Sequence, residues 1–375
     1  MKKIIMLLSG PCDSILDPDP RVENEAEALA EAGYNVLILA WDRELKSKKF
    51  EDKNVFKIER MRIKSSFGKG SKQIFRFVRF NRKLFFKLMK TKFDIVHCHD
   101  FDTLIPGFLA AKLKGKKIVF DSHEFYPAMM QDQGMKTLSK IAKRIQSFVV
   151  KRVNLIVVVN PILERIFNKL NKKVVLIMNS KKLNEFQNIK ENPLKKYKNK
   201  KKFLYIGAFS KGRNLLELID IFKNKNNAML ILGGNGYLEK QIKDKLHKNI
   251  IFLGRVKKED VPKYTLASDY LLAIYKSTLL NNDIAGPPNK LFEAIAAGKP
   301  IITSKKGSTG EMVRSIGCGI TINPDDKEEI DFIIEKLISN KGLQRELSKK
   351  AKEAQKLYNW DNESKNLKKA YNSIN

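Results

Sequence analysis

The sequence GPPNKLFEAIAAGKP, residues 286–300, is the most informative stretch of this 375-residue chain. Pro288 stands where a helix would begin, and Gly298 would end that helix just ahead of a strand. Lys290 and Glu293 are three residues apart and therefore share one helix face, while the apolar residues between them can pack inward. A helix followed at once by a buried strand is typical of a parallel α/β sheet.

The same alternation of apolar strand, short loop and amphipathic helix continues in both directions. In the second half we expect strands at 203–206, 228–232, 250–253, 270–274, 300–303 and 319–322, with a long helical region from about 326. In the first half we expect strands at 4–9, 35–41, 55–63, 94–97, 117–120, 155–159 and 174–178. Helices are expected at 21–32, 71–89, 103–114 and 137–152, and another one is capped by Asn160-Pro161. This alternation predicts parallel sheets with helices on both faces.

A polar, Lys/Asn-rich stretch at 181–202 interrupts the alternation. We therefore predict an α/β protein with two doubly wound, Rossmann-like domains facing a cleft, at residues 1–185 and 203–358. Residues 186–202 are the expected linker, and a C-terminal helix at about 360–375 can pack back on the first domain. The chain length fits two domains of ordinary size.

The composition favours a cytoplasmic globular protein. The apolar fraction is 43%, which suffices for real cores. Cys12, Cys98 and Cys318 lie far apart and form neither a disulfide framework nor a zinc pattern. The apolar run after Met1 is shorter than a secretory signal, and no stretch is apolar enough to span a bilayer.

The formal net charge of +32 is extreme. One interpretation is compositional, because lysine is abundant throughout. The other is an anionic partner, and residues 60–92 point to it, with twelve Lys or Arg, interleaved phenylalanines and no Asp or Glu. Such a segment suits an anionic membrane surface, which predicts either a peripheral protein at the inner face of the cell membrane or a merely solvated helix face.

Three of the four histidines stand at the ends of consecutive strands in the first half, His97, His99 and His123. Ligands of open parallel sheets bind at the carboxyl ends of strands, and histidine handles protons near neutral pH. We therefore expect a functional cleft there. The spacing of His97 and His99 is weak evidence for a zinc site, and no metal is expected.

Two glycine-rich loops in the second half are suited to an anionic ligand. Lys211 and Arg213 follow a strand in the loop 207–214, ahead of a helix. Gly234 lies in the loop after the next strand and allows the backbone to approach a ligand. Glu293, near the start of its helix, can accept hydrogen bonds from two ribose hydroxyls.

Taken together, these motifs resemble the family 4 glycosyltransferases of group 1, which are retaining enzymes with the GT-B fold. The matching segments are DPRV (19–22), 28–36, DIVHCHD (94–100), DSHE (121–124), PNKLFE (288–293) and AGKP (297–300). The resemblance implies transfer of a sugar from a nucleotide-diphosphate sugar to an acceptor, either lipid-linked or a polysaccharide. It implies that the donor binds the second domain, that the acceptor binds the first, and that domain closure assembles the site.

The resemblance also implies roles for individual residues. His123 matches the active-site histidine beside the reacting carbon. Arg213, with Lys211, matches the cations on the donor diphosphate, which would make a metal cofactor unnecessary. Glu293 matches the glutamate that binds the donor ribose. Val256 matches the segment whose backbone contacts the nucleotide base. Lys290 and Gly234 complete the predicted donor-binding set.

This sequence departs from the family pattern at three places. Ala285 and Ala208 stand where many members carry Glu and Arg, and Asp283 lies close to the first of these positions. The loop 9–20 lacks a Gly-Gly pair, for which Gly10 and Arg21 can substitute in part.

Two other functions remain open at this stage. A nucleotide-sugar epimerase on the same fold would use the donor alone. A basic nucleic-acid-binding protein would explain the charge, but the chain carries no helix-turn-helix, zinc or RNA-reading signature, so no nucleic-acid partner is expected.

Overall fold

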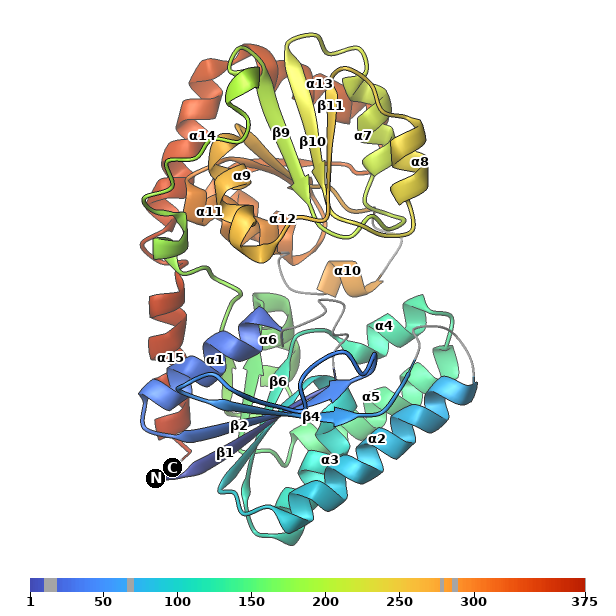
Figure 1. The fold of residues 1–375 in the computed structure, drawn as a ribbon, viewed down its shortest axis with the longest axis vertical. Helices are drawn as coiled ribbons and strands as arrows, with labels where there is room; N and C mark the ends of the chain where they lie inside the picture. Colours follow the sequence, from blue (N-terminus) through green and yellow to red (C-terminus); the bar gives the residue numbers. More distant parts are fainter. Residues whose placement is uncertain (10–18, 66–70, 277–279, 285–288, 375) are drawn as a thin grey trace. The chain divides into compact units, whose positions relative to one another are not determined.

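The computed structural model describes residues 1–9, 19–65, 71–276, 280–284 and 289–374. The chain divides into two compact units, each built on one predominantly parallel sheet (Figure 1). The first unit comprises Met1–Ile177 and Ser364–Asn375, and the second comprises Met178–Glu363.

The first unit contains an eight-stranded sheet in the order β3-β4-β2-β1-β5-β6-β7-β8. All neighbours are parallel except β3, which runs antiparallel to β4 at the edge. The strands are β1 (Lys3–Leu8), β2 (Asn35–Asp42), β3 (Phe50–Asp52), β4 (Lys57–Arg62), β5 (Ile95–His99), β6 (Lys117–Ser122), β7 (Leu155–Val158) and β8 (Val174–Leu176). The central strands β1, β5 and β6 are buried almost throughout, as expected for a sheet covered on both faces.

Helices cover both faces of this sheet. They are α1 (Pro20–Glu31), α2 (Ser71–Lys90), α3 (Asp100–Leu113), α4 (Tyr126–Asp132), α5 (Lys136–Val150), α6 (Pro161–Asn168) and the last turns of α15 (Trp360–Asn372). The connections through α2, α3 and α5 all cross the sheet in the same direction, so right-handed crossovers place these helices on one face. The β1-to-β2 connection runs the opposite way and places α1 on the other face. There Tyr34, just after α1, meets Tyr371 of α15 at 5.8 Å between ring centroids.

The second unit contains a six-stranded parallel sheet in the order β11-β10-β9-β12-β13-β14. Its strands are β9 (Lys201–Ile206), β10 (Ala228–Gly233), β11 (Ile250–Gly254), β12 (Tyr270–Ala273), β13 (Ile301–Ser304) and β14 (Gly319–Ile322). Its helices are η1 (Leu183–Phe186), η2 (Lys195–Tyr197), α7 (Leu215–Phe222), α8 (Glu239–Asp244), η3 (Lys258–Asp260), α9 (Val261–Ala267), α10 (Leu280–Ile284), α11 (Asn289–Ala297), α12 (Gly307–Ile316), α13 (Lys327–Ser339) and α14 (Lys341–Ala354). A cluster of fully buried aromatic and aliphatic side chains, including Phe203 and Tyr270, forms its main core.

Each sheet has one point where the strand order reverses direction. In the first unit this point lies between β1 and β5, and in the second it lies between β9 and β12. Loops that leave neighbouring strands on opposite faces open a crevice at such a point, and open α/β sheets bind their ligands there. The two reversals therefore locate the candidate site within each unit.

The predicted α/β class, with two parallel-dominated sheets, is confirmed, and the Asn160 cap is present, since its Oδ1 accepts from the amide of Leu163 at 2.9 Å. The linker predicted at 186–202 is wrong, because that stretch belongs to the second unit. Phe186 and Leu194 are buried there and pack against the unit's own apolar clusters. Pro288, the predicted helix start, lies outside the described residues. No helix in the described part of the chain combines the length and apolarity needed to cross a membrane.

Candidate functional site

The carboxyl ends of β5 and β6 bring histidines and a carboxylate together in the first unit. His99 is the register partner of Asp121, so their side chains lie on the same face of the sheet. His97 is two residues earlier on that face, and its ring stacks on the His99 ring with centroids 4.3 Å apart. His99 Nδ1 lies 3.2 Å from Asp121 Oδ2. All three side chains are inaccessible to solvent.

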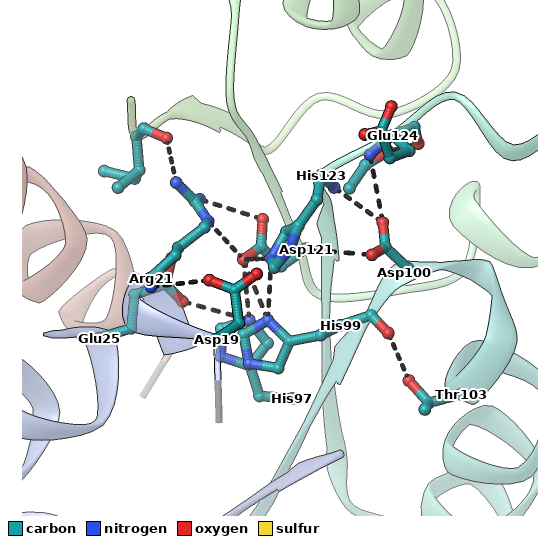
Figure 2. Close-up of polar contacts among 12 residues, drawn as sticks. Asp19, Arg21, Glu25, His97, His99, Asp100, Thr103, Asp121, His123 and Glu124 are labelled. Carbon is teal, nitrogen blue, oxygen red and sulfur yellow. Dashed lines mark hydrogen bonds and ion pairs between the residues drawn. The ribbon is translucent and has the colours of Figure 1, made fainter. Parts of the chain in front are cut away.

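Helix α1 adds a buried arginine to this group (Figure 2). Asp19 caps the helix and Pro20 opens it, which fixes Arg21 in the first turn, facing the sheet. The Arg21 guanidinium donates to both carboxylate oxygens of Asp121 at 3.1 Å, and to the carbonyl of Ile177 at 2.7 Å. One turn later, Glu25 Oε1 lies 3.0 Å from Arg21 Nε. The guanidinium therefore contacts two buried acidic side chains at once.

Asp100 holds the loop that carries His123. Its backbone is in the left-handed region, with φ of 59°, a conformation that aspartate tolerates better than most residues. From there its carboxylate accepts the backbone amides of His123 at 2.9 Å and Glu124 at 3.2 Å. Backbone strain of this kind clusters at functional sites. The arrangement fixes His123 at the carboxyl end of β6.

The protonation states follow from burial and from these partners. Burial lowers the pKa of His123, but the charges of Asp121 and Asp100 outweigh it and raise the pKa to about 10. Burial favours a neutral Asp121, but Arg21 and His123 hold its pKa well below the ordinary value. The pKa values of His97 and His99 are lowered, mainly by burial. At neutral pH, His123 is thus a cation, and its Nε2 donates to Asp121 Oδ2 at 2.9 Å.

The C-terminal helix reaches the same group. The hydroxyl of Tyr371 lies 2.7 Å from His97 Nδ1, and both side chains are fully buried. Burial raises the pKa of Tyr371, so its hydroxyl stays protonated and donates to His97. The last turns of α15 therefore fix the tautomer and the ring orientation of a histidine within the network.

Four of these side chains could also coordinate a metal ion. Glu25, His97, His99 and Asp121 each present one ligand atom, and these atoms lie within 4.8 Å of one another. Two imidazoles and two carboxylates are a set that suits zinc. Arg21 nevertheless already pairs with Asp121 at 3.1 Å and lies 3.0 Å from Glu25. A divalent ion would stand beside that fixed cation, so the geometry favours a hydrogen-bonded charge network.

Glu25 provides a pH test of this network. Burial raises its pKa from 4.5 to about 8, against the attraction of Arg21. Between these pH values the folded protein holds a proton that the unfolded chain has lost, so this contribution to stability is full below pH 4.5 and declines as the pH rises to 8. In Glu25→Gln this decline in stability should be absent. Relative to wild type, the free energy of unfolding of the variant should therefore rise by on the order of 3 kcal/mol across this pH range. Urea unfolding at several pH values measures it, and parallel pH profiles for the two proteins would contradict the assignment.

In the second unit, two glycine loops interlock at the carboxyl ends of β9 and β10. The amide of Gly207 donates to Gly233 at 2.9 Å, and that of Phe209 donates to Asn235 at 2.8 Å. Gly234 has φ of 141°, and a Cβ atom at this residue would lie 1.9 Å from the carbonyl oxygen of Gly207. Only glycine therefore allows this approach of the two loops.

Cations gather around Tyr275, which follows β12. The Arg213 guanidinium stacks over the Tyr275 ring at 4.1 Å and donates to Ser210 Oγ at 3.4 Å. Lys290 Nζ lies 3.3 Å from the Tyr275 hydroxyl and 4.6 Å from the Tyr205 ring centroid. Lys211, in the loop of Arg213, is exposed and lies over the Tyr237 ring. Among the described residues, none of these three cations has a carboxylate within ion-pairing distance of its charged group.

Helix α11 places Lys290 and Glu293 on one face, as the sequence predicts. Burial alone would lower the pKa of Lys290, but Tyr275, Tyr205 and Glu293 outweigh it and leave the pKa raised. Glu293 is 14% exposed, and its carboxylate lies 3.5 Å from Lys181 Nζ. Val256, after β11, is half-buried and lies against Gly233, where a Cβ would be 2.7 Å from Val256 Cγ2. The predicted donor-binding residues thus lie in the loops after β9, β10 and β11 and in the first half of α11.

Sequence reasoning did not assign a role to several residues that the structure brings into these groups. Arg21 was predicted only as a partial substitute for a glycine pair, and Glu25, Asp100 and Tyr371 were given no role. Tyr205 and Tyr275 were not singled out either. The DSHE motif was a usable signal for Asp121, since it stands two residues before His123.

The glycine loop allows a matched pair of substitutions. Gly234→Ala should displace the Gly207 loop and cost about 1–3 kcal/mol of stability, because the added methyl meets backbone. Gly33→Ala in the first unit is the control: its φ of 88° is also in the region that favours glycine, but a Cβ there meets nothing within 4 Å. Urea unfolding and nucleotide binding should both be impaired more in Gly234→Ala, and equal losses would show that the interlock is unimportant.

Comparison with known proteins gives a consistent result over most of the chain. The family described as "Glycosyl transferases group 1" matches residues 186–354, and the one described as "Glycosyltransferase Family 4" matches residues 21–180. The uncharacterized glycosyltransferase MJ1069 of Methanocaldococcus jannaschii is 28% identical over 315 residues, which are 78% of each chain. A second relative from that organism, MJ1178, is 27% identical over 46% of this chain and 48% of its own length.

Solved structures of low sequence identity share the fold. Sucrose-phosphate synthase from Thermosynechococcus elongatus has a TM-score of 0.80 at 16% identity, covering 99% of this chain and 98% of that one. Anabaena HepE, solved in complex with UDP-glucose, has a TM-score of 0.72 at 15% identity over the full length of both chains. The predicted GT-B fold is therefore confirmed.

Proposed function

We propose the reaction of this chain from one premise: it belongs to the family 4 glycosyltransferases of group 1. It moves a sugar from a nucleoside-diphosphate sugar to an acceptor hydroxyl, with retention of configuration at the anomeric carbon. The donor binds the carboxyl edge of the second sheet, and the acceptor binds the first unit. The acceptor is a lipid-linked sugar or a growing polysaccharide.

The observation that carries this proposal is the group of cations around Tyr275. Arg213 and Lys290 both contact this ring, and the nearby Lys211 adds a third positive charge. A half-buried lysine that stays protonated without a carboxylate partner is suited to an anionic ligand. The guanidinium fork and the lysines can hold the oxygens of a diphosphate, and Glu293, one turn after Lys290, can accept ribose hydroxyls.

The same charges account for the chemical step. As the bond between the anomeric carbon and the diphosphate breaks, negative charge grows on the leaving group, where preorganised cations stabilise it. The acceptor hydroxyl attacks from the face that the diphosphate leaves, and its proton passes to an oxygen of the departing diphosphate. The family resemblance assigns His123 of the first unit to the reacting sugar, and since this imidazolium is already protonated, it acts as a hydrogen-bond donor.

Uridine diphosphate sugars are the donors that we would test first. HepE was solved with UDP-glucose, and a further protein of the same fold, from E. coli, was solved with UDP-2-fluoro glucose. Because side-chain cations serve the diphosphate, we expect turnover in EDTA to equal turnover in buffer with added magnesium.

Incubation with a panel of UDP- and GDP-sugars tests the reaction, with chromatography of both the nucleotide and the sugar. We expect free nucleoside diphosphate from one donor, more of it with a suitable acceptor, and much less with His123→Ala or Arg213→Ala. Conversion of the nucleotide sugar into an isomer without release of nucleotide would identify an epimerase. Full turnover in both variants would overturn the proposed roles of these residues.

A further inference from the structure

Helix α5 exposes its large apolar side chains. Leu138, Ile141, Ile145 and Phe148 are spaced by three, four and three residues, so they form one stripe, and Phe148 is 55% exposed. The buried face of the helix consists of Ser139, Ala142, Gln146, Val149 and Val150. Burying smaller and polar residues while exposing leucine, isoleucine and phenylalanine is the reverse of an ordinary surface helix. The stripe is therefore an unpartnered apolar face.

Cations border this stripe. Lys140, Arg144 and Lys151 follow one another along the flank of the helix and are exposed. No Asp or Glu occurs between residues 133 and 163. Within the part of the chain that the structure describes, no carboxylate pairs with a cation of α5. The face thus combines apolar side chains with positive charge that is not compensated locally.

The neighbouring helices continue the surface, and Figure 1 shows α2, α3 and α5 grouped on one side of the first unit. On α2, Phe75, Val78 and Phe86 point outward, with Arg79 and Arg82 exposed beside them. Leu109 and Leu113 are exposed on α3, which packs against both of the other helices.

The basic stripe predicted at 60–92 forms only part of this surface. Arg60 lies in β4, where it is buried and lies 2.7 Å from Glu51, and Lys87 pairs with Glu59 at 2.8 Å. These cations stabilise the fold. The outward face of α2 belongs to the surface, and α5, which lies beyond the predicted stripe, supplies its most continuous apolar row.

We propose that the outward faces of α2, α3 and α5 form a docking surface for an anionic lipid bilayer. Apolar side chains flanked by Lys and Arg are the chemistry that binds the headgroup region of such a membrane. Exposed apolar side chains that gather in one place and are bordered by polar residues mark an interaction site. The surface belongs to the first unit alone, and its function does not depend on the proposed sugar transfer.

A basic hollow at the end of α5 offers a place for a lipid phosphate. It is a shallow depression, open to solvent and lined by Lys143, Arg144, Ser147, Phe148, Lys151 and Arg152. The Arg152 guanidinium stacks on the Phe148 ring at 3.8 Å, which holds a cation beside an outward aromatic side chain. A headgroup phosphate here would be contacted by charge while Phe148 enters the boundary with the acyl chains.

The surface suits lipid better than other occupants. A second copy of this chain would bring one cationic face against another, which costs free energy. A nucleic acid would satisfy the cations but would leave the aliphatic row of Leu138, Ile141 and Ile145 without a partner, since its backbone is polar.

Vesicle co-sedimentation tests the proposal. The full chain is mixed with vesicles of phosphatidylcholine, and separately with vesicles of equal parts phosphatidylcholine and phosphatidylglycerol. One variant carries Ile141→Ser, Ile145→Ser and Phe148→Ser, and another carries Lys140→Gln, Lys143→Gln and Arg144→Gln. The matched controls are Phe332→Ser and Lys349→Gln on exposed positions of α13 and α14. All substituted side chains are exposed, and circular dichroism verifies folding.

We expect binding to the anionic vesicles alone, weakened about tenfold or more by the serine variant and about a hundredfold by the glutamine variant. The controls should bind like wild type. Equal binding to both vesicle types, no binding, or unchanged binding by the α5 variants would overturn the proposal. The proposal would also be overturned if wild type bound no vesicles but formed a dimer, and if the serine variant were a monomer. Stronger binding to RNA than to anionic vesicles, unaffected by the serine variant, would overturn it in favour of nucleic acid.

A fluorescent reporter distinguishes insertion from surface adsorption. Trp41 and Trp360 are both buried, so Phe148→Trp introduces a tryptophan that reports on the end of α5. Its emission should shift to the blue with anionic vesicles and should be quenched by brominated acyl chains. An emission unchanged by vesicles that sediment the protein would show that α5 does not enter the bilayer.

Discussion

Replacing Arg213 by alanine is expected to lower the rate of sugar transfer by about two to three orders of magnitude, the usual cost of removing one preorganised group that stabilises developing negative charge. The Arg213 side chain stacks on Tyr275, and it has no carboxylate partner among the described residues. Its charge is therefore available to a leaving diphosphate. Steady-state kinetics with the donor identified from the panel measures the loss.

Two variants sharpen this test. Arg213→Lys keeps the charge but loses the planar fork, so its activity should lie between those of wild type and alanine. Arg345→Ala removes an exposed arginine of α14 and should leave the rate unchanged. If Arg213→Ala and Arg345→Ala were equally active, the diphosphate could not be bound as proposed.

Asp121→Ala is expected to cost about 3–5 kcal/mol of stability, the cost of removing one member of a buried ion pair. Asp121 is inaccessible to solvent, accepts two bonds from Arg21 and one from His123, and lies beside His99. Its removal leaves the charges of Arg21 and His123 buried together. Urea unfolding of the variant measures the cost.

Asp52→Ala is the matched control for this prediction. Asp52 lies on the edge strand β3, is 60% exposed and lies 3.4 Å from Lys57. A surface pair of this kind is worth at most about 1 kcal/mol. A cost for Asp121→Ala no greater than that for Asp52→Ala would show that the buried network does not stabilise the first unit.

The main strands of both sheets were predictable because parallel strands buried on both faces are continuous apolar runs. The edge strand β3 was missed, since Phe50–Asp52 is three residues long and half exposed. Helix α4 was missed for a similar reason, because Tyr126–Asp132 is short and its only strong signal is Pro127. The linker was misplaced because Phe186 and Leu194 are isolated apolar residues in a polar stretch, and only tertiary packing shows that they are buried.

The site was predictable where one segment carries the chemistry. Lys290 and Glu293 lie on one short helix, and His97 and His99 lie on one strand, so local geometry was enough. The buried network was not predictable, because its members come from distant segments. Tyr371 and His97 are 274 residues apart, and nothing local indicates that Arg21 faces Asp121 across 100 residues.

The apolar face of α5 illustrates a different limit. The spacing of Leu138, Ile141, Ile145 and Phe148 is the same as that of a core-facing helix, and periodicity alone would bury it. The structure shows the opposite orientation, because Ala142 and Val149 are buried instead. The packing of neighbouring elements decides which face of a helix is buried, and sequence periodicity carries no information about that packing.

The proposed reaction requires that the edge of the second sheet binds a nucleoside diphosphate. Titration calorimetry with UDP and with GDP tests it most directly, on wild type, on Glu293→Ala and on the exposed control Glu346→Ala. The account predicts that wild type binds one of the two nucleotides, that Glu293→Ala weakens this binding about tenfold or more, as the loss of a charged acceptor for ribose hydroxyls requires, and that Glu346→Ala does not. Equal affinity in wild type and Glu293→Ala, or binding of neither nucleotide, would contradict the account.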